Sequence, residues 1–220
     1  MRILCLHGAG TNSRIFEIQT AAIRYELGDS HVYDFVEGTF PAEMYPGVEL
    51  IAWKDEPMYA YFDEHSPDTG FAAYHYLEQH LHNEGPYDGV IAFSQAGTMV
   101  LTYLIHLAKQ RPGVEMPFKF AIIMSITHPP LDYEALQEGR VACIDLQSDT
   151  GIVPIPTAHI WGSLDEAANN VAMSNNVCKA DVKWVYVHGQ GHEVPGAGAK
   201  HDVTRTVNII RRAVDSAANQ

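Results

Sequence analysis

The 220-residue sequence is poor in cysteine, in basic side chains and in long apolar runs, and each shortage excludes a class of protein. Cys5, Cys143 and Cys178 are an odd number without metal-type spacing, so we expect neither a disulfide scaffold nor a cysteine metal site. The chain has only 14 Lys and Arg residues but 27 Asp and Glu residues. The resulting net charge of −13 disfavours nucleic acid and anionic membranes as partners. Without a visible signal peptide or membrane span, a cytoplasmic protein is expected.

Short apolar segments alternate with segments whose apolar residues have helical spacing. Strands are predicted at 2–6, 31–36, the run ending at 94, 118–126, 157–161 and 182–187, and helices at 15–27, 71–82, 99–109 and 203–217. Strands that alternate with helices form a mostly parallel sheet with helices on both faces, which explains why the strands are continuously apolar. With no repeat and no long linker, residues 1–220 are predicted to form a single α/β domain.

The segment from residue 41 to residue 70 interrupts this alternation. It contains four prolines, and aromatic residues are interleaved with them: Tyr45, Trp53, Tyr59, Tyr61 and Phe62. The segment is too long for a simple connection, and long irregular loops in compact domains are often functional. We therefore expect residues 41–70 to line a pocket.

Ser94 stands where an apolar strand should turn into a helix. The strand-like run Gly89–Phe93 precedes it, and helical spacing begins at Met99. A serine at such a turn projects its hydroxyl from the carboxyl edge of a sheet, where it can act as a nucleophile. The turn is sharp, so the positions two before and two after the serine must be small. They are Ala92 and Ala96, where a strict G-x-S-x-G motif has glycines.

The loop after the first strand, His7-Gly8-Ala9-Gly10, is rich in glycine. Glycine lets the backbone approach a ligand closely, and backbone amides can stabilise the negative charge that develops on a carbonyl oxygen in acyl transfer. We therefore predict an oxyanion hole made by the backbone amides of Ala9 and Gln95. A dinucleotide site would need G-x-G-x-x-G, but Ser13 occupies the third glycine position, so no NAD or nucleotide cofactor is expected.

A serine nucleophile needs a base within hydrogen-bond reach, and histidine suits this role because its pKa lies near neutrality. The chain has 12 histidines, so position must discriminate among them. His192 follows the last strand in a Gly-Gln-Gly-His segment, whose backbone is free to carry the side chain over the sheet edge. His188 at the strand end and His159 within a strand are in positions that favour structural roles.

Asp165 is the predicted acid that orients the histidine, because it directly follows the penultimate strand. An aspartate there could also cap a helix, and Asp145 and Asp149 are alternative acids from an irregular stretch. The order Ser94, Asp165, His192 is the nucleophile, acid and base order of α/β-hydrolases. This order, with each residue after a predicted strand, predicts an α/β-hydrolase fold.

Four motifs resemble the FSH-type serine hydrolases, a eukaryotic branch of the α/β-hydrolases with many fungal members, over nearly the whole chain. The motifs are Ile3-Leu4-Cys5-Leu6-His7-Gly8-Ala9-Gly10-Thr11-Asn12-Ser13, Gly85-Pro86-Tyr87-Asp88-Gly89-Val90-Ile91-Ala92-Phe93-Ser94-Gln95, His159-Ile160-Trp161-Gly162 and Gly191-His192-Glu193-Val194-Pro195. The resemblance implies Ser94 as nucleophile, Asp165 as acid and His192 as base. The family typically has Gly-Phe-Ser-Gln-Gly, so Ala92 and Ala96 depart from it. An alanine would be strained at either position if the backbone required a positive φ.

The leading hypothesis is a serine esterase or thioesterase that uses neither a metal nor a cofactor. Similar fungal proteins are often linked to polyketide biosynthesis, which implies a small acyl ester or thioester substrate and a polyketide synthase as partner. The acidic surface disfavours docking to a strongly acidic carrier protein. The alternative keeps the fold without net hydrolysis: the protein would bind a small hydrophobic intermediate, or cyclise it with His192 as base.

Overall fold

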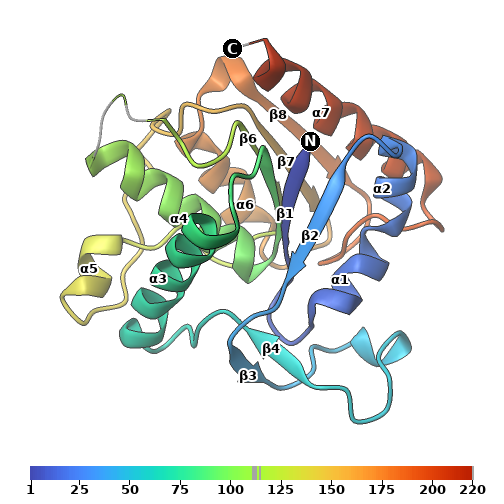
Figure 1. Ribbon diagram of the computed structural model, residues 1–220, viewed down its shortest axis with the longest axis horizontal. Coiled ribbons are helices and arrows are strands. Elements are labelled where there is room, and N and C mark those ends of the chain that lie inside the picture. The colour runs from blue at the N-terminus through green and yellow to red at the C-terminus, as the bar shows by residue number, and fades with distance from the viewer. Residues whose placement is uncertain (111–112, 114, 220) are drawn as a thin grey trace.

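The computed structural model describes residues 1–110, 113 and 115–219, which form a central sheet between helices (Figure 1). The strands are β1 (Arg2–Leu6), β2 (Val32–Val36), β3 (Phe40–Ala42), β4 (Met58–Ala60), β5 (Gly89–Phe93), β6 (Phe120–Met124), β7 (Thr157–Gly162) and β8 (Lys183–His188). The helices are α1 (Ser13–Gln19), α2 (Ala21–Leu27), α3 (Pro67–Glu84), α4 (Gln95–Gln110), α5 (Tyr133–Gln137), α6 (Ala168–Ser174) and α7 (Lys200–Ala218). Six strands pair in the order β2-β1-β5-β6-β7-β8, and every neighbouring pair is parallel.

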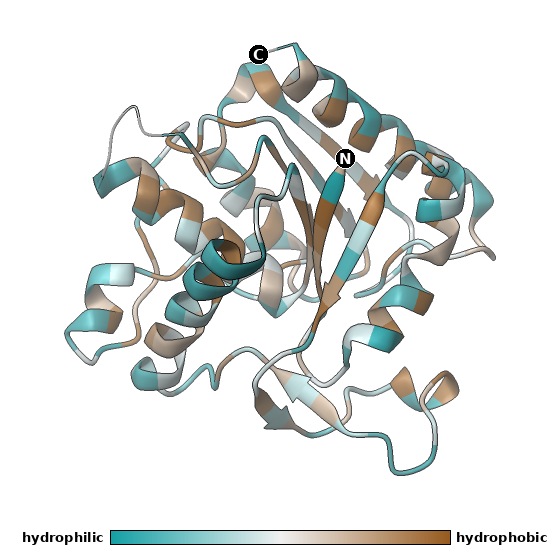
Figure 2. Cartoon of the chain, in the orientation of Figure 1, coloured by the Kyte–Doolittle hydropathy of each residue, from teal (hydrophilic) through white to brown (hydrophobic). Residues whose placement is uncertain are grey.

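The sheet is buried on both faces, as predicted for an α/β fold. Successive residues of a strand point to opposite faces, so each central strand contributes to two cores. Ile3 and Cys5 of β1 pack with residues of α1, α2 and α7, whereas Leu4 and Leu6 pack with residues of α3 and α4. Figure 2 shows the apolar strands between helices that carry hydrophilic residues on their outer faces. The predicted α/β fold is therefore confirmed.

Several element boundaries differ from the sequence prediction. The predicted helix 15–27 is two helices separated at Thr20, whose hydroxyl donates a hydrogen bond of 2.7 Å to the Phe16 carbonyl oxygen within α1. A threonine hydroxyl that bonds back to the preceding turn in this way often bends or interrupts a helix. Helix α3 begins at Pro67 rather than residue 71, because Ser66 caps it and proline is favoured at a first helical position.

Two helices and a strand pair were not predicted. Helix α5 has five residues and α6 has seven, and neither is long enough to show a clear helical period. The segment 41–70, predicted to be irregular, contributes to the antiparallel pair β3–β4 and to a short 3₁₀ helix, Val48–Leu50. Within the part of the chain that the structure describes, no helix has the length and apolar character needed to cross a membrane.

Backbone bonds tie the β3–β4 region to the loop after β1. The Gly10 amide donates to the Tyr59 carbonyl oxygen at 2.9 Å, and the Tyr45 amide donates to the Gly10 carbonyl oxygen at 2.9 Å. A Cβ on Gly10 would lie 2.6 Å from the Glu43 carbonyl oxygen, and its φ of +71° also favours glycine. This close approach places part of segment 41–70 at the carboxyl edge of the sheet.

Glu56 anchors the same segment to the start of α1. Its carboxylate accepts hydrogen bonds from Arg14, from Asn12 Nδ2 at 2.9 Å and from the Trp53 amide at 2.7 Å. The bond from Arg14 is the largest of the effects that lower the pKa of Glu56 from 4.5 to about 2. The anionic form is therefore stabilised by folding.

Replacing Glu56 with glutamine is expected to lower the melting temperature at pH 7 by about 3 °C. Because the folded pKa lies below the unfolded value, the stabilisation is complete above about pH 5 and is lost as the pH falls from 4.5 towards 2. Thermal melts of both proteins at pH 7 and pH 3 measure this, and the difference between them should shrink at pH 3. An equal or larger difference at pH 3 would contradict the assignment.

Candidate active site

Ser94 occupies the sharp turn between β5 and α4. Its φ is +58°, a left-handed value that is uncommon for a residue with a side chain, and its amide donates to the Met124 carbonyl oxygen of the neighbouring β6 at 2.8 Å. The helix then begins at Gln95. The strained backbone, held by β6 and the first turn of α4, leaves the hydroxyl at the carboxyl edge of the sheet.

The alanines that replace the family's glycines create no backbone strain. Ala92 and Ala96 are fully buried, and neither has a positive φ. The position that requires glycine is Gly97, because a Cβ there would lie 2.7 Å from Ile126 Cγ2 and 3.3 Å from Ile123 Cγ2. The elbow therefore meets its steric requirement with a pattern shifted by one residue from the strict motif.

We expect Ala96→Gly to leave kcat for ester hydrolysis unchanged within about two-fold, while the free energy of unfolding falls by about 1 kcal/mol through the lost helix propensity. Gly97→Ala, the matched change at the next residue, is expected to lower the free energy of unfolding by about 1–3 kcal/mol through overpacking. It should also lower kcat, because the added methyl group displaces the turn that carries Ser94. Urea denaturation and steady-state kinetics on both variants test this. A higher kcat in Ala96→Gly would show that the alanine does limit catalysis.

The loops after β7 and β8 are bonded to each other, and this brings an acid and a base together. The Ser163 amide donates to the His188 carbonyl oxygen at 2.8 Å, and the Leu164 amide donates to the Gln190 carbonyl oxygen at 3.0 Å. A Cβ on Gly162 would lie only 2.1 Å from that Gln190 oxygen, so only glycine permits the approach.

The structure brings the three predicted catalytic residues into one hydrogen-bonded chain. His192 Nε2 lies 2.9 Å from Ser94 Oγ, and His192 Nδ1 lies 2.8 Å from Asp165 Oδ2. A carboxylate only accepts, so Nδ1 carries the imidazole proton and Nε2 presents its lone pair to the serine hydroxyl. Side-chain exposure is 2% for Asp165 and 13% for His192, so little water competes for the acid–base contact.

The alternative bases and acids are engaged elsewhere. His159 is buried beside Thr157, and burial lowers its pKa to about 3. The ring of His188 accepts a bond from the Gln190 amide at 3.3 Å, and burial is the main cause that lowers its pKa. Asp149 pairs with Lys109 at 2.7 Å. The Asp145 carboxylate accepts from the Gln147 amide, and the Asp145 carbonyl oxygen accepts from the Ser148 hydroxyl. Asp165 Oδ1 accepts from the Ala167 amide at 2.9 Å in the turn before α6, but it does not cap that helix, whose N-cap is Ala167 without a side-chain bond.

The glycine-rich loop after β1 is held by its own side chains. The His7 Nδ1 proton and the Thr11 hydroxyl both donate to the Gly8 carbonyl oxygen, each at 2.7 Å, and His7 Nε2 accepts from the Gly38 amide at 2.9 Å. A Cβ on Gly8 would lie 3.1 Å from the Ser94 Cβ and 3.0 Å from the Phe93 ring. The loop therefore passes directly beside the elbow.

Ala9 and Gln95 line the same groove as Ser94, and neither backbone amide donates a hydrogen bond to any group among the described residues. The Gln95 side chain, in contrast, accepts from the Tyr61 amide at 2.9 Å and donates to the Phe62 carbonyl oxygen at 3.0 Å. It thereby fixes the end of segment 41–70 to the elbow. The two unpaired amides can receive an anionic oxygen at this edge.

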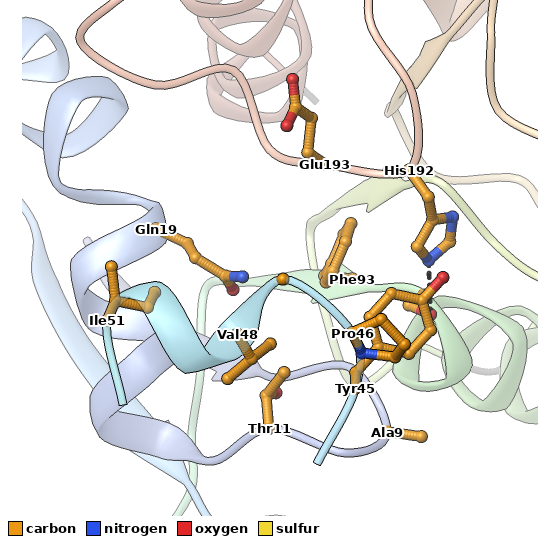
Figure 3. Close-up of a pocket in the computed structure, with 12 residues that line it drawn as sticks. Ala9, Thr11, Gln19, Tyr45, Pro46, Val48, Ile51, Phe93, His192 and Glu193 are labelled. Carbon is orange, nitrogen blue, oxygen red and sulfur yellow. Dashed lines mark hydrogen bonds between the residues drawn. The ribbon is translucent and has the colours of Figure 1, made fainter. Parts of the chain in front are cut away.

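Two hollows meet at Ser94 and share Ala9, Tyr45 and His192 in their walls. The small cavity, about 160 Å³, is shown in Figure 3 and is also lined by Pro46, Val48, Ile51 and Phe93. The large groove, about 630 Å³, is also lined by Glu64, Gln95, Thr127, His128, Leu164, Glu166 and Asn170. Tyr45 and Phe93 flank the His192 ring, with centroid distances of 5.8 and 5.2 Å.

Glu64 and His128 at the site were not singled out from the sequence, and for Tyr45, Tyr61 and Glu64 no individual contact was predicted. The last three belong to the segment expected to line a pocket, so the sequence indicated the segment but not the individual contacts. Tyr61 accepts from the His7 amide and donates to the Val36 carbonyl oxygen, a link that no local pattern reveals. Within residues 1–110, 113 and 115–219, no cluster of three or more His, Cys, Asp or Glu is placed to hold a metal ion.

Comparison with solved structures shows the same fold. An Arabidopsis thaliana SOBER1 variant superposes with a TM-score of 0.61 at 14% identity, covering 97% of this chain and 100% of that one. The Bacillus cereus carboxylesterase gives a TM-score of 0.55 at 12% identity over 94% of this chain and 87% of that one. These identities are low, so the matches confirm the α/β-hydrolase architecture alone.

Sequence comparison identifies relatives that span nearly the same length. Esterase FPY3 from Fusarium mangiferae is 34% identical over 98% of this chain and 95% of that protein. Probable esterase tazC from Aspergillus terreus is 29% identical over 88% of this chain and 85% of that protein. The family model described as serine hydrolase (FSH1) matches residues 1–203. The resemblance expected from the motifs is thus confirmed, and the chain belongs to the FSH1 family of serine hydrolases.

Proposed function

We propose that the protein is an esterase, that Ser94, His192 and Asp165 are its catalytic triad and that the amides of Ala9 and Gln95 form its oxyanion hole. The observation that carries the proposal is the continuous chain from Ser94 Oγ through His192 to Asp165, with distances of 2.9 and 2.8 Å. It starts at a serine whose backbone is held in a left-handed conformation. This arrangement fits nucleophilic acyl transfer.

In the acylation step, the Ser94 oxygen attacks the carbonyl carbon of the ester. His192 Nε2 takes the hydroxyl proton and then gives it to the departing alcohol or thiol as the carbon–oxygen or carbon–sulfur bond breaks. Asp165 stabilises the imidazolium that forms. The Ala9 and Gln95 amides stabilise the oxyanion of the tetrahedral intermediate, and each such donor is typically worth about 3 kcal/mol.

In the deacylation step, water attacks the acyl group on Ser94. His192 removes a proton from the water and returns it to the serine oxygen as the acyl–serine bond breaks. The products are the free acid and the original enzyme. Every proton transfer uses the same imidazole, and the cycle requires no redox partner or metal.

The substrate we propose is a small acyl ester or thioester of polyketide type that occupies both hollows. We also propose that residues 1–220 form one domain, which contains the whole site. The small cavity, walled in part by segment 41–70, suits a compact group of the substrate, and the large groove suits a larger part. The net charge of −13 favours a free substrate over one attached to an acidic carrier protein.

A short incubation with an oxyester and a thioester of the same acyl group tests this assignment. The expected result is a mass increase equal to one acyl group, located by peptide mapping at Ser94, and the ratio of the two kcat/KM values identifies the preferred class. An adduct on a different residue, or hydrolysis that continues without any acyl-enzyme and without labelling by fluorophosphonates, would overturn the proposed triad.

A further inference from the structure

A third hollow adjoins the large groove on the side away from the small cavity, and we call it the distal cavity. Its volume is about 160 Å³, and its exposed wall surface is mostly apolar. The residues that line the distal cavity but not the large groove are Phe62, His65, Thr98, Leu131, Val141 and Cys143. The residues that it shares with the large groove are Glu64, Gln95, Thr127 and His128, so these four side chains form the boundary between the two.

Only part of this boundary is firmly held. The Gln95 side chain is buried and bonded to the backbone of Tyr61 and Phe62. Glu64 Oε2 and His128 Nε2 lie 2.8 Å apart, but their side chains are 36% and 51% exposed. An ion pair that exposed typically changes an equilibrium by no more than a factor of about five. The Gln95 side chain, which is held in place, also interacts with the Glu64 carboxylate, so the Glu64–His128 contact is the part of the boundary that can open at small cost.

The boundary also contains a polar atom without a partner. Thr127 Oγ1 is buried and makes no hydrogen bond within the described residues, whereas the Thr127 carbonyl oxygen accepts from Asn170 at 2.9 Å. Buried hydroxyl groups in folded proteins are usually paired. Because this oxygen is closed off from both hollows in the structure, a hydroxyl or carbonyl oxygen of a ligand could pair with it only after the boundary has opened.

We propose that the distal cavity binds the far apolar end of a chain-like ester substrate, and that Glu64 and His128 separate to admit it. The proposal rests on the proposed function of Ser94, since it needs the ester to react at the groove's other end. Each buried methylene strengthens binding by about four-fold, so two or three methylenes outweigh the loss of one exposed ion pair. The site thus selects oxygenated chains with an apolar end of several carbons.

Two series of fluorophosphonates test this proposal without requiring turnover. In one series the alkyl chain, from ethyl to decyl, is attached to phosphorus, and in the other it is attached to the ester oxygen. In each reaction the Ser94 oxygen bonds to phosphorus, the phosphorus–fluorine bond breaks, fluoride leaves and the hydroxyl proton passes to His192. The measurement is the second-order rate constant for labelling of Ser94, followed by intact mass.

In at least one series we expect the octyl probe to react about ten-fold faster than the ethyl probe, or more. Val141→Trp, which fills the distal cavity, should abolish the difference. Val185→Trp is the matched control, since Val141 and Val185 are both 43% exposed and Val185, on the edge strand β8, lines none of the three hollows. A flat length dependence in both series, or a dependence that survives Val141→Trp, would overturn the proposal.

The ion pair has its own test. Glu64→Gln is expected to raise the labelling rate constant of the octyl probe by up to about five-fold, because Glu64 and His128 then separate more easily. The octyl probe should still react faster than the ethyl probe. Glu138→Gln removes the same charge and breaks an exposed pair, with Arg140, at a position that lines none of the three hollows, so it controls for net charge. A lower octyl rate in Glu64→Gln alone would overturn the role of the pair. If the ethyl probes fail to label Ser94, the proposed triad fails instead, so the two failures are distinguishable.

Discussion

Replacing Ser94 with alanine is expected to abolish labelling by fluorophosphonates and to lower kcat for ester hydrolysis by about 10⁵–10⁶-fold. The side chain is 2.9 Å from the His192 base, and no other hydroxyl is hydrogen-bonded to that ring among the residues described. Without the oxygen, the acyl-enzyme cannot form, and only binding and the oxyanion hole remain to accelerate direct attack by water. Comparing kcat and intact mass before and after probe treatment measures both effects.

Ser125→Ala is a matched control for this change. Ser125 follows β6, the neighbour of β5, and it is also buried with a positive φ, +42°. Its hydroxyl has no hydrogen-bond partner in the described part of the chain, so its loss removes a similar group from a similar backbone without touching the proposed base. Labelling and kcat should be retained. If both variants lose activity equally, the effect comes from damage to the sheet edge rather than from loss of the nucleophile.

The order of the candidate site residues could be predicted because it depends on topology alone. In a parallel sheet the carboxyl ends of all strands lie at one edge, so a serine after one strand and an aspartate and a histidine after two others must approach each other. The glycine-rich loop after β1 was expected at that edge for the same reason, because β1 belongs to the same parallel sheet. No knowledge of side-chain packing is needed for either inference.

The walls of the site could not be predicted because they depend on contacts between distant segments. Gln95 binds the backbone at Tyr61 and Phe62, 34 and 33 residues earlier in the chain, and Glu64 meets His128, 64 residues later. Nothing in the local sequence of either partner indicates these pairs. Helix α6 was missed for a related reason, since Val171 and Ser174 are its only buried residues, and two positions define no period.

At the turn around Ser94, the glycine motif and the backbone geometry mark different positions. Counting glycines in a motif compares residue types, whereas the backbone responds to φ and to available space. Ala92 and Ala96 satisfy both, and the strain is located at Ser94 itself. The position with no room for a Cβ, Gly97, lies one residue beyond the one that the motif marks.

Asp165→Asn is expected to lower kcat by about 10⁴-fold while leaving the fold intact. Asp165 uses its two oxygens differently: Oδ1 accepts from the Ala167 amide at 2.9 Å, and Oδ2 faces His192 Nδ1 at 2.8 Å. In the asparagine variant the carbonyl oxygen must stay towards the Ala167 amide, since an NH₂ group there would oppose another donor. The NH₂ group is then directed at His192.

That orientation reverses the imidazole tautomer. Nδ1 would accept from the asparagine and Nε2 would carry the proton, so Nε2 could no longer accept the proton from Ser94. The bond from the Ala167 amide persists, and therefore the melting temperature should stay close to that of the native protein. The expected signature is a large loss of kcat without a comparable loss of stability. Steady-state kinetics together with a thermal melt measure both quantities.

The other two aspartates considered from the sequence provide the controls. Asp149→Asn removes the charge that pairs with Lys109, and Asp145→Asn weakens the bond from the Gln147 amide by replacing a carboxylate acceptor with a neutral amide oxygen, so either variant can lower stability. Neither carboxylate is hydrogen-bonded to His192, so neither change should reduce kcat by more than a few-fold. If Asp165→Asn retained a tenth of the native kcat, or if Asp149→Asn fell as far, the acid would have been assigned to the wrong strand end.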